Sequence, residues 1–440
     1  MPLPLTIKLE NTGRRFEAIG FGPILAAASA PNNSFAFMKR VFFLNRFYWP
    51  DHSATSQLVG DLAPYLVSCG HDVHVITSRQ LYDDPSARLA PEETVAGVKV
   101  HRVMGAHFGR SRLVGRAIDY LSFYASARRM LSATIRPGDI VVAMTDPPLI
   151  SVVAMRVAKH RGASLINWLQ DIYPEIAVAL GVPFLKGPIL RGLGALRDRS
   201  LKNAAANVVL GNLMAEKVAA LGVARDRIHT IANWSDDEEI VPIAAADNPL
   251  RRELGLQGKF VVGYSGNLGR AHEFGTILGA AERLRDRSDI AFLCIGGGHL
   301  LSQLAKSVQD RHLGNVRIMD YQDRAVLKLS LGVPDVHWVS LRPEVEGLIV
   351  PSKIYGIAAA GRPVIAVCAE SGEISRMVQQ YRCGMVVEPG NADALAAAIL
   401  KLRDDSALRA EMGRHARAML EASFTRQQAL ERWRRLLEQD

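Results

Sequence analysis

The stretch LRPEVEGLIVPSKIYGIAAAGRPVIAV, residues 341–367, decides the fold because it combines a turn, a helix and a strand. Gly347 is typical of a turn, Pro351 suits the first turn of a helix, and the pattern predicts a helix over residues 352–360. The apolar run at 364–367 predicts a buried strand of a parallel sheet. A turn, a helix and a strand in this order indicate a parallel α/β sheet.

The loop before this helix is a candidate anion site. We expect the backbone N–H groups of residues 347–349 to point out of the helix start, where unpaired donors and the helix dipole attract phosphate. Lys353, one turn into the helix, adds a point charge for the same anion. The stretch therefore predicts a phosphate-binding loop.

Length and composition indicate a globular protein with two domains. A chain of 440 residues is too long for one ordinary core, and 48% hydrophobic with 22% charged residues is typical of a folded protein. No apolar run approaches the roughly 20 residues that span a bilayer. The four cysteines lie far apart, which favours neither a disulfide framework nor a zinc site and fits a reducing cytoplasm.

The net charge of +9, from 53 Lys+Arg against 44 Asp+Glu, fits three kinds of partner. These are nucleic acid, an anionic membrane surface and phosphorylated small molecules. The sequence has no helix-turn-helix, RNP or zinc-finger pattern. We therefore expect no nucleic-acid partner.

Residues 1–37 do not resemble the start of a domain. Their charges follow no helical period, and no basic segment directly precedes a long apolar core, so a signal peptide fits poorly. We expect a disordered extension that precedes the folded part of the chain.

Strand and helix patterns alternate from residue 40 onward. Apolar runs such as RVFFL, DVHVIT and DIVVAMT are separated by amphipathic segments, which predicts a doubly wound parallel α/β fold. Residues 237–249 show little periodicity and indicate a linker. We expect a first domain over 38–236, a second over 250–420, and a C-terminal helix over 421–440 that crosses back to the first domain.

Five segments in this order resemble the retaining glycosyltransferases of family 4. They are FYWPDHSATSQLVGDLA (47–63), TDPPLI (145–150), LQDIYPE (169–175), GYSGNLG (263–269) and EGLIVPSKIYGIAAAGRPVIA (346–366). The resemblance covers residues 39–430 and is closest to the bacterial surface-polysaccharide branch, which includes the colanic-acid and N-acetyl-fucosaminyl transferases. It implies the GT-B fold, in which two Rossmann-like domains face each other across a cleft.

The resemblance also implies a reaction. A sugar would pass, with retention, from a UDP- or GDP-linked donor to a polyprenyl-diphosphate-linked saccharide at the inner face of the cell membrane. Enzymes of this fold often hold the donor diphosphate with backbone N–H groups and basic side chains. We therefore expect no metal ion and no cofactor, and a cytoplasmic, peripheral location.

Two acidic residues are the catalytic candidates that the resemblance implies. Glu346 stands at the family's first motif glutamate and is expected to approach the anomeric carbon of the transferred sugar. Asp171 follows a predicted buried strand, at the edge where parallel sheets bind ligands, and is expected to meet the acceptor or the sugar. Structural roles are the alternatives: either carboxylate could instead accept hydrogen bonds at a helix start.

The donor-binding candidates lie in the glycine-rich loop 263–273 and around the opening stretch. They are Gly266, Asn267, Arg270, His272, Gly347, Leu348, Lys353 and Glu373. Many relatives have an Arg and a Lys where this chain has Asn267 and His272, so Arg270 is expected to compensate. Ile354 stands where the family has a second glutamate that binds ribose, which leaves the ribose contact unassigned.

Two of these candidates have equally good structural explanations. Glu373 fits a first-turn acidic residue that interacts with a helix dipole. Lys353 fits a lysine on a helix surface.

The acceptor-side candidates follow two strands of the first domain. Ser53 and Thr55 belong to the segment SATS, which stands where relatives carry a glycine-rich loop under the diphosphate. The resemblance implies that His52, and Glu175 of the LQDIYPE segment, neighbour Asp171 at the acceptor or the sugar. The two hydroxyl residues equally suit a helix N-cap, and His52 equally suits a surface loop.

Residues 110–129, RSRLVGRAIDYLSFYASARR, combine arginines with aliphatic and aromatic side chains on a predicted helix. This composition suits an anionic membrane surface, and residues 185–202 are a second segment of the same kind. A core helix with solvated arginines is the alternative explanation of both segments, and the composition fits it slightly better.

Two other functions remain open from sequence. A UDP-sugar epimerase uses a similar two-domain architecture and would convert the donor without an acceptor. A non-catalytic scaffold of a polysaccharide assembly complex would explain the missing second glutamate at Ile354.

Overall fold

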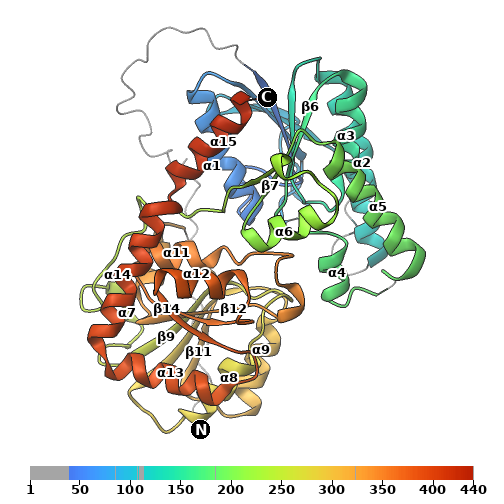
Figure 1. Ribbon diagram of the computed structural model, residues 1–440. Helices are drawn as coiled ribbons and strands as arrows, with labels where there is room; N and C mark the ends of the chain where they lie inside the picture. Colours follow the sequence, from blue (N-terminus) through green and yellow to red (C-terminus); the bar gives the residue numbers. More distant parts are fainter. Residues whose placement is uncertain are drawn as a thin grey trace. The chain divides into compact units, whose positions relative to one another are not determined.

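The computed structural model describes residues 39–84, 86–106, 108, 113–183, 185–322 and 324–439. The predicted extension over residues 1–37 lies outside these residues. Lys39–Asp440 form one compact unit, and it contains two parallel-sheet α/β domains (Figure 1). The predicted fold class is confirmed.

In the described part of the chain, the first sheet has eight strands in the order β3-β4-β2-β1-β5-β6-β7-β8. Its strands are β1 (Arg40–Leu44), β2 (Asp72–Ser78), β3 (Glu92–Val95), β4 (Val98–Val103), β5 (Ile140–Ala143), β6 (Ser164–Trp168), β7 (Ala206–Val209) and β8 (Ile228–Thr230). All neighbours pair in parallel except β3 and β4. The sequence analysis missed β3, which turns into β4 through two residues with positive φ, Ala96 at 48° and Gly97 at 80°.

Helices connect the parallel strands of this sheet. They are α1 (Ala54–Ser68), α2 (Leu113–Thr134), α3 (Ile150–Arg161), α4 (Glu175–Ala179), α5 (Gly187–Asn203) and α6 (Asn212–Ala220), with the 3-10 turn η1 (Arg225–Arg227) before β8. The apolar strands are buried, as in β1, where Val41 to Leu44 are each 0% exposed. Burial on both faces explains why these strands are continuous apolar runs.

The second sheet, within the described residues, has six parallel strands in the order β11-β10-β9-β12-β13-β14. Its strands are β9 (Phe260–Asn267), β10 (Ile290–Gly297), β11 (Val316–Met319), β12 (Val336–Ser340), β13 (Val364–Val367) and β14 (Gly384–Val387). Its helical elements are α7 (Pro249–Glu253), α8 (Gly275–Arg283), α9 (Leu301–Asp310), η2 (Arg324–Val326), α10 (Leu327–Gly332), η3 (Pro343–Val345), α11 (Lys353–Ala359), α12 (Glu373–Tyr381), α13 (Ala392–Asp404) and α14 (Ser406–Ser423). Helices α8 and α13 lie side by side against this sheet (Figure 1).

The opening stretch folds nearly as predicted. Helix α11 has Ser352 and Ala360 as its caps, and Gly361 follows in the left-handed region with φ 63°. Pro351 was placed wrongly in the first turn, because it precedes the helix. The segment before it forms a turn that is closed by a bridge between Glu346 and Ile349.

The C-terminal helix α15 (Arg426–Gln439) packs on the first domain. It lies beside α1 (Figure 1), where Tyr65 donates a hydrogen bond to Glu431 over 3.0 Å. Trp433 is fully buried in the same hydrophobic cluster as β1, and its ring centroid is 4.5 Å from that of Trp168. The last helix therefore completes the core of the first domain.

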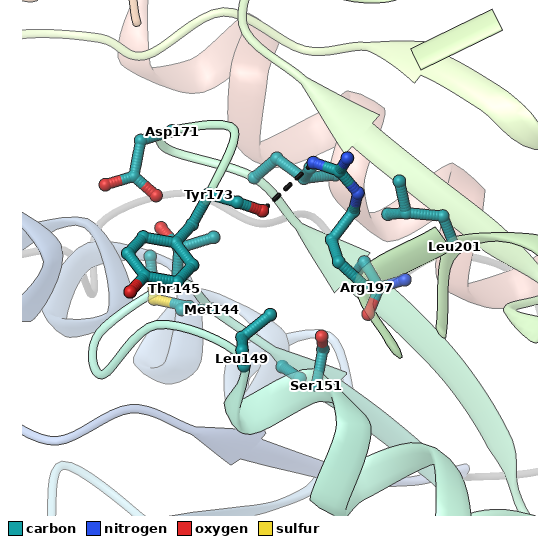
Figure 2. A pocket seen from close by; sticks show the side chains of 11 residues that line it. Met144, Thr145, Leu149, Ser151, Asp171, Tyr173, Arg197 and Leu201 are labelled. Atoms are coloured by element: carbon teal, nitrogen blue, oxygen red, sulfur yellow. Dashed lines mark hydrogen bonds between the residues drawn. The ribbon is translucent and has the colours of Figure 1, made fainter. Parts of the chain in front are cut away.

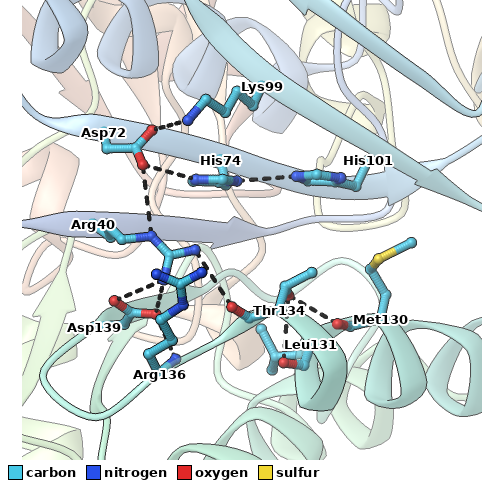
Figure 3. Close-up of polar contacts among 10 residues, drawn as sticks. All are labelled: Arg40, Asp72, His74, Lys99, His101, Met130, Leu131, Thr134, Arg136 and Asp139. Atoms are coloured by element: carbon cyan, nitrogen blue, oxygen red, sulfur yellow. Dashed lines mark hydrogen bonds and ion pairs between the residues drawn. The ribbon is translucent and has the colours of Figure 1, made fainter.

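A polar cluster joins strands of the first sheet at its amino end (Figure 3). Arg40 at the start of β1 pairs with Asp139 over 3.0 Å, and Lys99 of β4 pairs with Asp72 of β2 over 2.7 Å. His74 Nδ1 and His101 Nε2 are 3.0 Å apart. These groups satisfy one another at the edge opposite the ligand-binding end of a parallel sheet, so we assign them a structural role.

No helix in the described part of the chain is long and apolar enough to cross a membrane. The cysteines at 69, 294, 368 and 383 are all free thiols. Part of the membrane candidate 110–129 lies outside the described residues, which include its side chains from Gly115 onward.

Candidate active site

The predicted catalytic residues follow strands of both sheets at the carboxyl ends. Asp171 comes after β6, and Glu346 comes after β12. Asp171 forms an antiparallel bridge with Ile349, and the Ile172 N–H donates to the Leu348 carbonyl over 2.9 Å. The backbone therefore brings the two catalytic candidates onto directly contacting loops.

The Glu346 carboxyl group is partly buried and incompletely paired. Its Oε1 is buried without a hydrogen-bond partner among the described residues, and its Oε2 accepts from the Glu373 N–H over 3.4 Å. Burial raises the pKa of Glu346 from 4.5 to about 7, and the charge of Glu373 adds to this. A carboxylate whose charge is under-stabilised in the free protein is suited to meet a developing positive charge on a sugar.

Gly372 allows Glu346 its position. A Cβ at Gly372 would lie 2.3 Å from Glu346 Oε1, which is closer than any real contact. A side chain at Gly372 would therefore displace the Glu346 carboxylate.

Asp171 lies in a similarly unfavourable environment for charge. Burial raises the pKa of Asp171 to about 6, a hydrogen bond with the Thr145 side chain opposes this, and the charge of Asp146 adds to it. Its Oδ1 has no hydrogen-bond partner in the described part of the chain. Each catalytic candidate thus has a carboxyl group with a raised pKa, and one oxygen of that group has no hydrogen-bond partner among the described residues.

Asp171 also lines a small cavity with Tyr173, Thr145 and Arg197 (Figure 2). The cavity measures about 20 Å³. This is room for about one water molecule, so the cavity is too small to be a sugar site.

Glu175 forms an ion pair inside the first domain. Its two carboxylate oxygens accept from Arg197 over 2.8 and 2.7 Å, and Arg197 also donates to the Tyr173 carbonyl over 3.0 Å. Arg197 is only 5% exposed. The structure thus gives Glu175 a stabilising contact rather than a free carboxylate for the acceptor.

Lys353 and His272 meet under the glycine-rich loop. Lys353 Nζ lies 3.0 Å from His272 Nε2, and His272 Nδ1 lies 2.6 Å from the Ser340 carbonyl oxygen. The ammonium also lies 5.3 Å from the ring centroid of Tyr264. Burial lowers the pKa of Lys353 from 10.5 to about 8, and burial together with the Lys353 charge lowers the pKa of His272 to about 3.

Glycines let this lysine and the loops approach closely. Gly266 has φ 128°, and a Cβ there would lie 2.9 Å from Lys353 Cε. A Cβ at Gly296, on the neighbouring strand, would lie 2.1 Å from the Gly266 carbonyl oxygen. Asn267 and Arg270 of the same loop are exposed. Lys353 is therefore held below an open loop that carries one exposed arginine.

The predicted N–H donors before α11 are partly used in the structure. The Leu348 N–H donates to the Val345 carbonyl over 3.0 Å, and Gly347 has φ 69°. Because residues 347 and 348 form a turn and α11 begins only at Lys353, the N–H groups of residues 347–349 do not form a helix start. That expectation was wrong for Leu348.

Asp51 accepts the hydrogen bonds that order the loop with His52, Ser53 and Thr55. Asp51 was not among the candidates predicted from sequence. Asp51 Oδ1 accepts from the Ser53 N–H over 2.8 Å, and Oδ2 accepts from the Tyr82 N–H. Ser53 is the N-cap residue of α1, but its hydroxyl makes no capping bond. Thr55 accepts from Asn45 over 3.1 Å, and the His52 side chain is exposed. Of the three candidates His52, Ser53 and Thr55, His52 is the one with an exposed side chain.

The Glu373 carboxylate contacts backbone N–H groups of the protein, whereas we expected it to contact the donor. Its carboxylate accepts from the N–H groups of Asn212 and Leu213, over 3.0 and 2.8 Å. These are the first two residues of α6 in the first domain. Sequence gave no signal for this contact, because it joins residues about 160 positions apart.

Two Rossmann-like domains whose carboxyl-edge loops touch define the GT-B class of glycosyltransferases. Residues 54–234 match the family model described as a Glycosyl transferase 4-like domain, and residues 259–405 match Glycosyl transferases group 1. The chain therefore belongs to the family 4 glycosyltransferases, and it is an enzyme of that kind.

Two curated relatives are similar in sequence. WcaI of Escherichia coli strain K12, described as a colanic acid biosynthesis glycosyl transferase, is 27% identical over 367 residues, which cover 80% of this chain and 89% of WcaI. WbjE of Pseudomonas aeruginosa, described as a glycosyltransferase, is 29% identical over 296 residues, which cover 66% of this chain and 72% of WbjE.

Solved structures share the fold at low identity. Sucrose-phosphate synthase from Thermosynechococcus elongatus has a TM-score of 0.74 at 16% identity, covering 91% of this chain and 98% of that one. HepE of Anabaena, solved with UDP and glucose, has a TM-score of 0.68 at 16% identity, covering 91% and 100%. WaaG, a glycosyltransferase involved in lipopolysaccharide biosynthesis, has a TM-score of 0.63 at 15% identity, covering 90% and 99%. These likenesses support the fold alone.

Proposed function

We propose that the chain is a retaining glycosyltransferase of bacterial surface-polysaccharide synthesis. The donor is a UDP- or GDP-linked sugar, and the acceptor is a saccharide on polyprenyl diphosphate. The descriptions of WcaI and WaaG support this pathway, and UDP with glucose in HepE supports a nucleotide-sugar donor.

The observation that carries this proposal is the partly buried cation at Lys353. Its ammonium is held by His272 under Gly266, at the carboxyl end of β9, where a parallel sheet binds phosphate. In this low-dielectric position a positive charge stabilises a leaving diphosphate far more than it would in water. Arg270 is exposed on the same loop and supplies a second positive charge to the diphosphate.

Glu346 acts on the sugar in this account. Its Oε1 is buried and unpaired, so an oxocarbenium-like carbon with partial positive charge would provide the partner that the free protein lacks. Asp171, on the contacting loop, carries its own free oxygen and suits the acceptor hydroxyl or the sugar. Retention requires that the incoming hydroxyl and the leaving diphosphate use the same face of the sugar.

Two helices of the first domain supply a surface for the membrane that carries such an acceptor. Leu121 of α2 is 65% exposed and Ile189 of α5 is 59% exposed. Exposed basic residues lie on the same helices, at Arg128, Arg129, Arg191, Arg199 and Lys202. Apolar side chains among basic ones suit a surface that contacts anionic headgroups.

Flotation with liposomes tests this surface separately from the chemistry. We expect binding to vesicles with anionic lipid at low salt, weaker binding at high salt, and weaker binding after Leu121→Ser with Ile189→Ser. No binding at either salt concentration would remove the membrane part of the proposal.

Transfer itself is tested by product analysis. We expect a product only when a lipid-linked acceptor is added, with the anomeric configuration of the donor. Conversion of the donor in the absence of an acceptor would indicate an epimerase instead, and failure to bind any nucleoside diphosphate would favour a scaffold.

A further inference from the structure

Glu373 connects the two domains through the start of a helix. It is 8% exposed, and both carboxylate oxygens accept hydrogen bonds from the first two N–H groups of α6, over 3.0 and 2.8 Å. The N-cap residue of α6 is Gly211, which has no side chain to cap the helix. Glu373 therefore supplies from the second domain the acceptor that the N-terminus of α6 lacks.

Gly211 leaves space for this contact because it has no side chain. A Cβ at Gly211 would lie 2.5 Å from Glu373 Cδ and 2.6 Å from its Oε1. Any side chain at this position would push the carboxylate away from α6. The absence of a Cβ at Gly211 thus leaves the space that the Glu373 carboxylate occupies at the start of α6.

Glu373 also contacts Glu346 through its backbone. The backbone N–H of Glu373 donates to Glu346 Oε2 over 3.4 Å, and Gly372 gives Glu346 the space it occupies. Glu346 therefore lies at the start of α12, just as Glu373 lies at the start of α6. A shift of α12 would move the Glu346 carboxylate with it.

Helix α6 reaches the surroundings of Glu346 a second time. The stem of Lys217 lies across Gly347, where a Cβ would be 2.6 Å from Lys217 Cε. The charge of Lys217 lowers the pKa of Glu346, against the larger effect of burial. Both contacts therefore couple the position of α6 in the first domain to the position of the segment that carries Glu346.

We propose that Glu373 is a positioning residue that ties α6 to α12, so that the placement of the first domain fixes the Glu346 carboxylate for sugar transfer. This inference rests on the proposed function for its catalytic consequence. It differs from the role expected from sequence, since the Glu373 carboxylate would bind α6 and not the donor.

Two variants break this contact in different ways. Glu373→Ala removes the acceptor, and Gly211→Ala leaves Glu373 intact but inserts a methyl group into its path. Gly60→Ala is the matched control, because a Cβ at Gly60 meets nothing within 4 Å. Hydrogen exchange at the Asn212 and Leu213 amides reports the contact directly and needs no activity.

In both variants, and not in the control, we expect hydrogen exchange at these amides to become faster and kcat to fall. Each of these two changes should be about tenfold or more. Affinity for UDP or GDP should stay within about twofold, since the diphosphate is held elsewhere. The NMR titration of the Glu346 carboxyl group should shift in both variants, and this holds even if the wild-type protein transfers no sugar. The proposed function and this inference can therefore fail separately.

Two results would overturn the inference. Faster amide exchange with an unchanged Glu346 titration and unchanged kcat would show that the contact is structural only. A loss of nucleotide affinity in Glu373→Ala as large as in Lys353→Met, with normal affinity in Gly211→Ala, would show that Glu373 binds the donor.

Discussion

The ammonium of Lys353 lies 3.0 Å from Nε2 of His272, and this contact fixes the tautomer of the imidazole. A lysine ammonium can only donate, so Nε2 is the acceptor and the Nδ1–H donates to the Ser340 carbonyl. His272 is therefore neutral, in agreement with its low pKa of about 3. His272, in the loop after β9, thus accepts a hydrogen bond from a lysine of α11.

Replacing Lys353 should weaken donor binding without unfolding the protein. We expect Lys353→Met to raise the Kd for the donor's nucleoside diphosphate by about 10- to 100-fold, because a charged hydrogen bond contributes about 1.5–3 kcal/mol. Isothermal titration calorimetry measures this. Lys306→Met, which removes an exposed lysine from α9, is the control and should bind normally. Equal affinity in both variants would remove Lys353 from the donor site.

His272 should act through Lys353. We expect His272→Ala to weaken diphosphate binding less than Lys353→Met does. The double variant should be no weaker than Lys353→Met alone, so the two residues should show a coupling energy of about 1 kcal/mol. A double-mutant cycle by calorimetry provides the measurement. Strict additivity would mean that the two side chains act independently.

The rate should depend on pH through Glu346 and Lys353. In the free enzyme Glu346 gains its charge as the pH rises through about 7, and Lys353 loses its charge as the pH rises through about 8. Transfer needs both charges, so kcat/KM should follow a narrow bell with limbs near these values. Glu346→Gln should have low activity and no acidic limb. An unchanged acidic limb in this variant would assign it to another group.

Glu346 should also make stability fall as pH rises. Its pKa is about 7 in the folded protein against 4.5 ordinarily, so between these values the folded state binds more protons than the unfolded state. The free energy of unfolding then decreases through this window. We expect Glu346→Gln to gain stability relative to the wild-type protein between about pH 5 and about pH 8, measured by urea unfolding. A constant difference across this range would contradict the raised pKa.

Glu175 should contribute to stability and not to sugar transfer. Glu175→Ala leaves the buried Arg197 with fewer acceptors, so we expect a loss of about 1–3 kcal/mol in unfolding free energy. Glu411→Ala, at an exposed position on α14, is the control and should change little. Normal stability together with lost transfer in Glu175→Ala would restore the acceptor role predicted from sequence.

The fold was largely predictable because its signal is local. Buried parallel strands such as β1 and β13 are continuous apolar runs, and Gly361 ends α11 as its sequence position indicates. Strand β3 escaped prediction because its residues are mostly exposed glutamate and threonine. The short helix α4 has only five residues, too few for a helical period to be visible.

The sequence predicted where the candidate site residues lie, but it did not predict which residues they contact. Glu346 was predicted from its match to the family's first motif glutamate, and Asp171 from its place after a buried strand, at the edge where ligands bind. The contacts of Lys353 with His272 and of Glu373 with α6 join residues 81 and about 160 positions apart. Spacing along the chain carries no information about such pairs, so only the folded structure gives them.

A nucleoside diphosphate should bind where Lys353 and His272 meet. Thermal unfolding with UDP, GDP, ADP and TDP, each added to the wild-type protein and to Lys353→Met, measures this binding. We predict that UDP or GDP raises the wild-type Tm in a concentration-dependent way and raises the Tm of Lys353→Met much less. No stabilisation by any of the four nucleotides, or equal stabilisation of both proteins, would contradict the account.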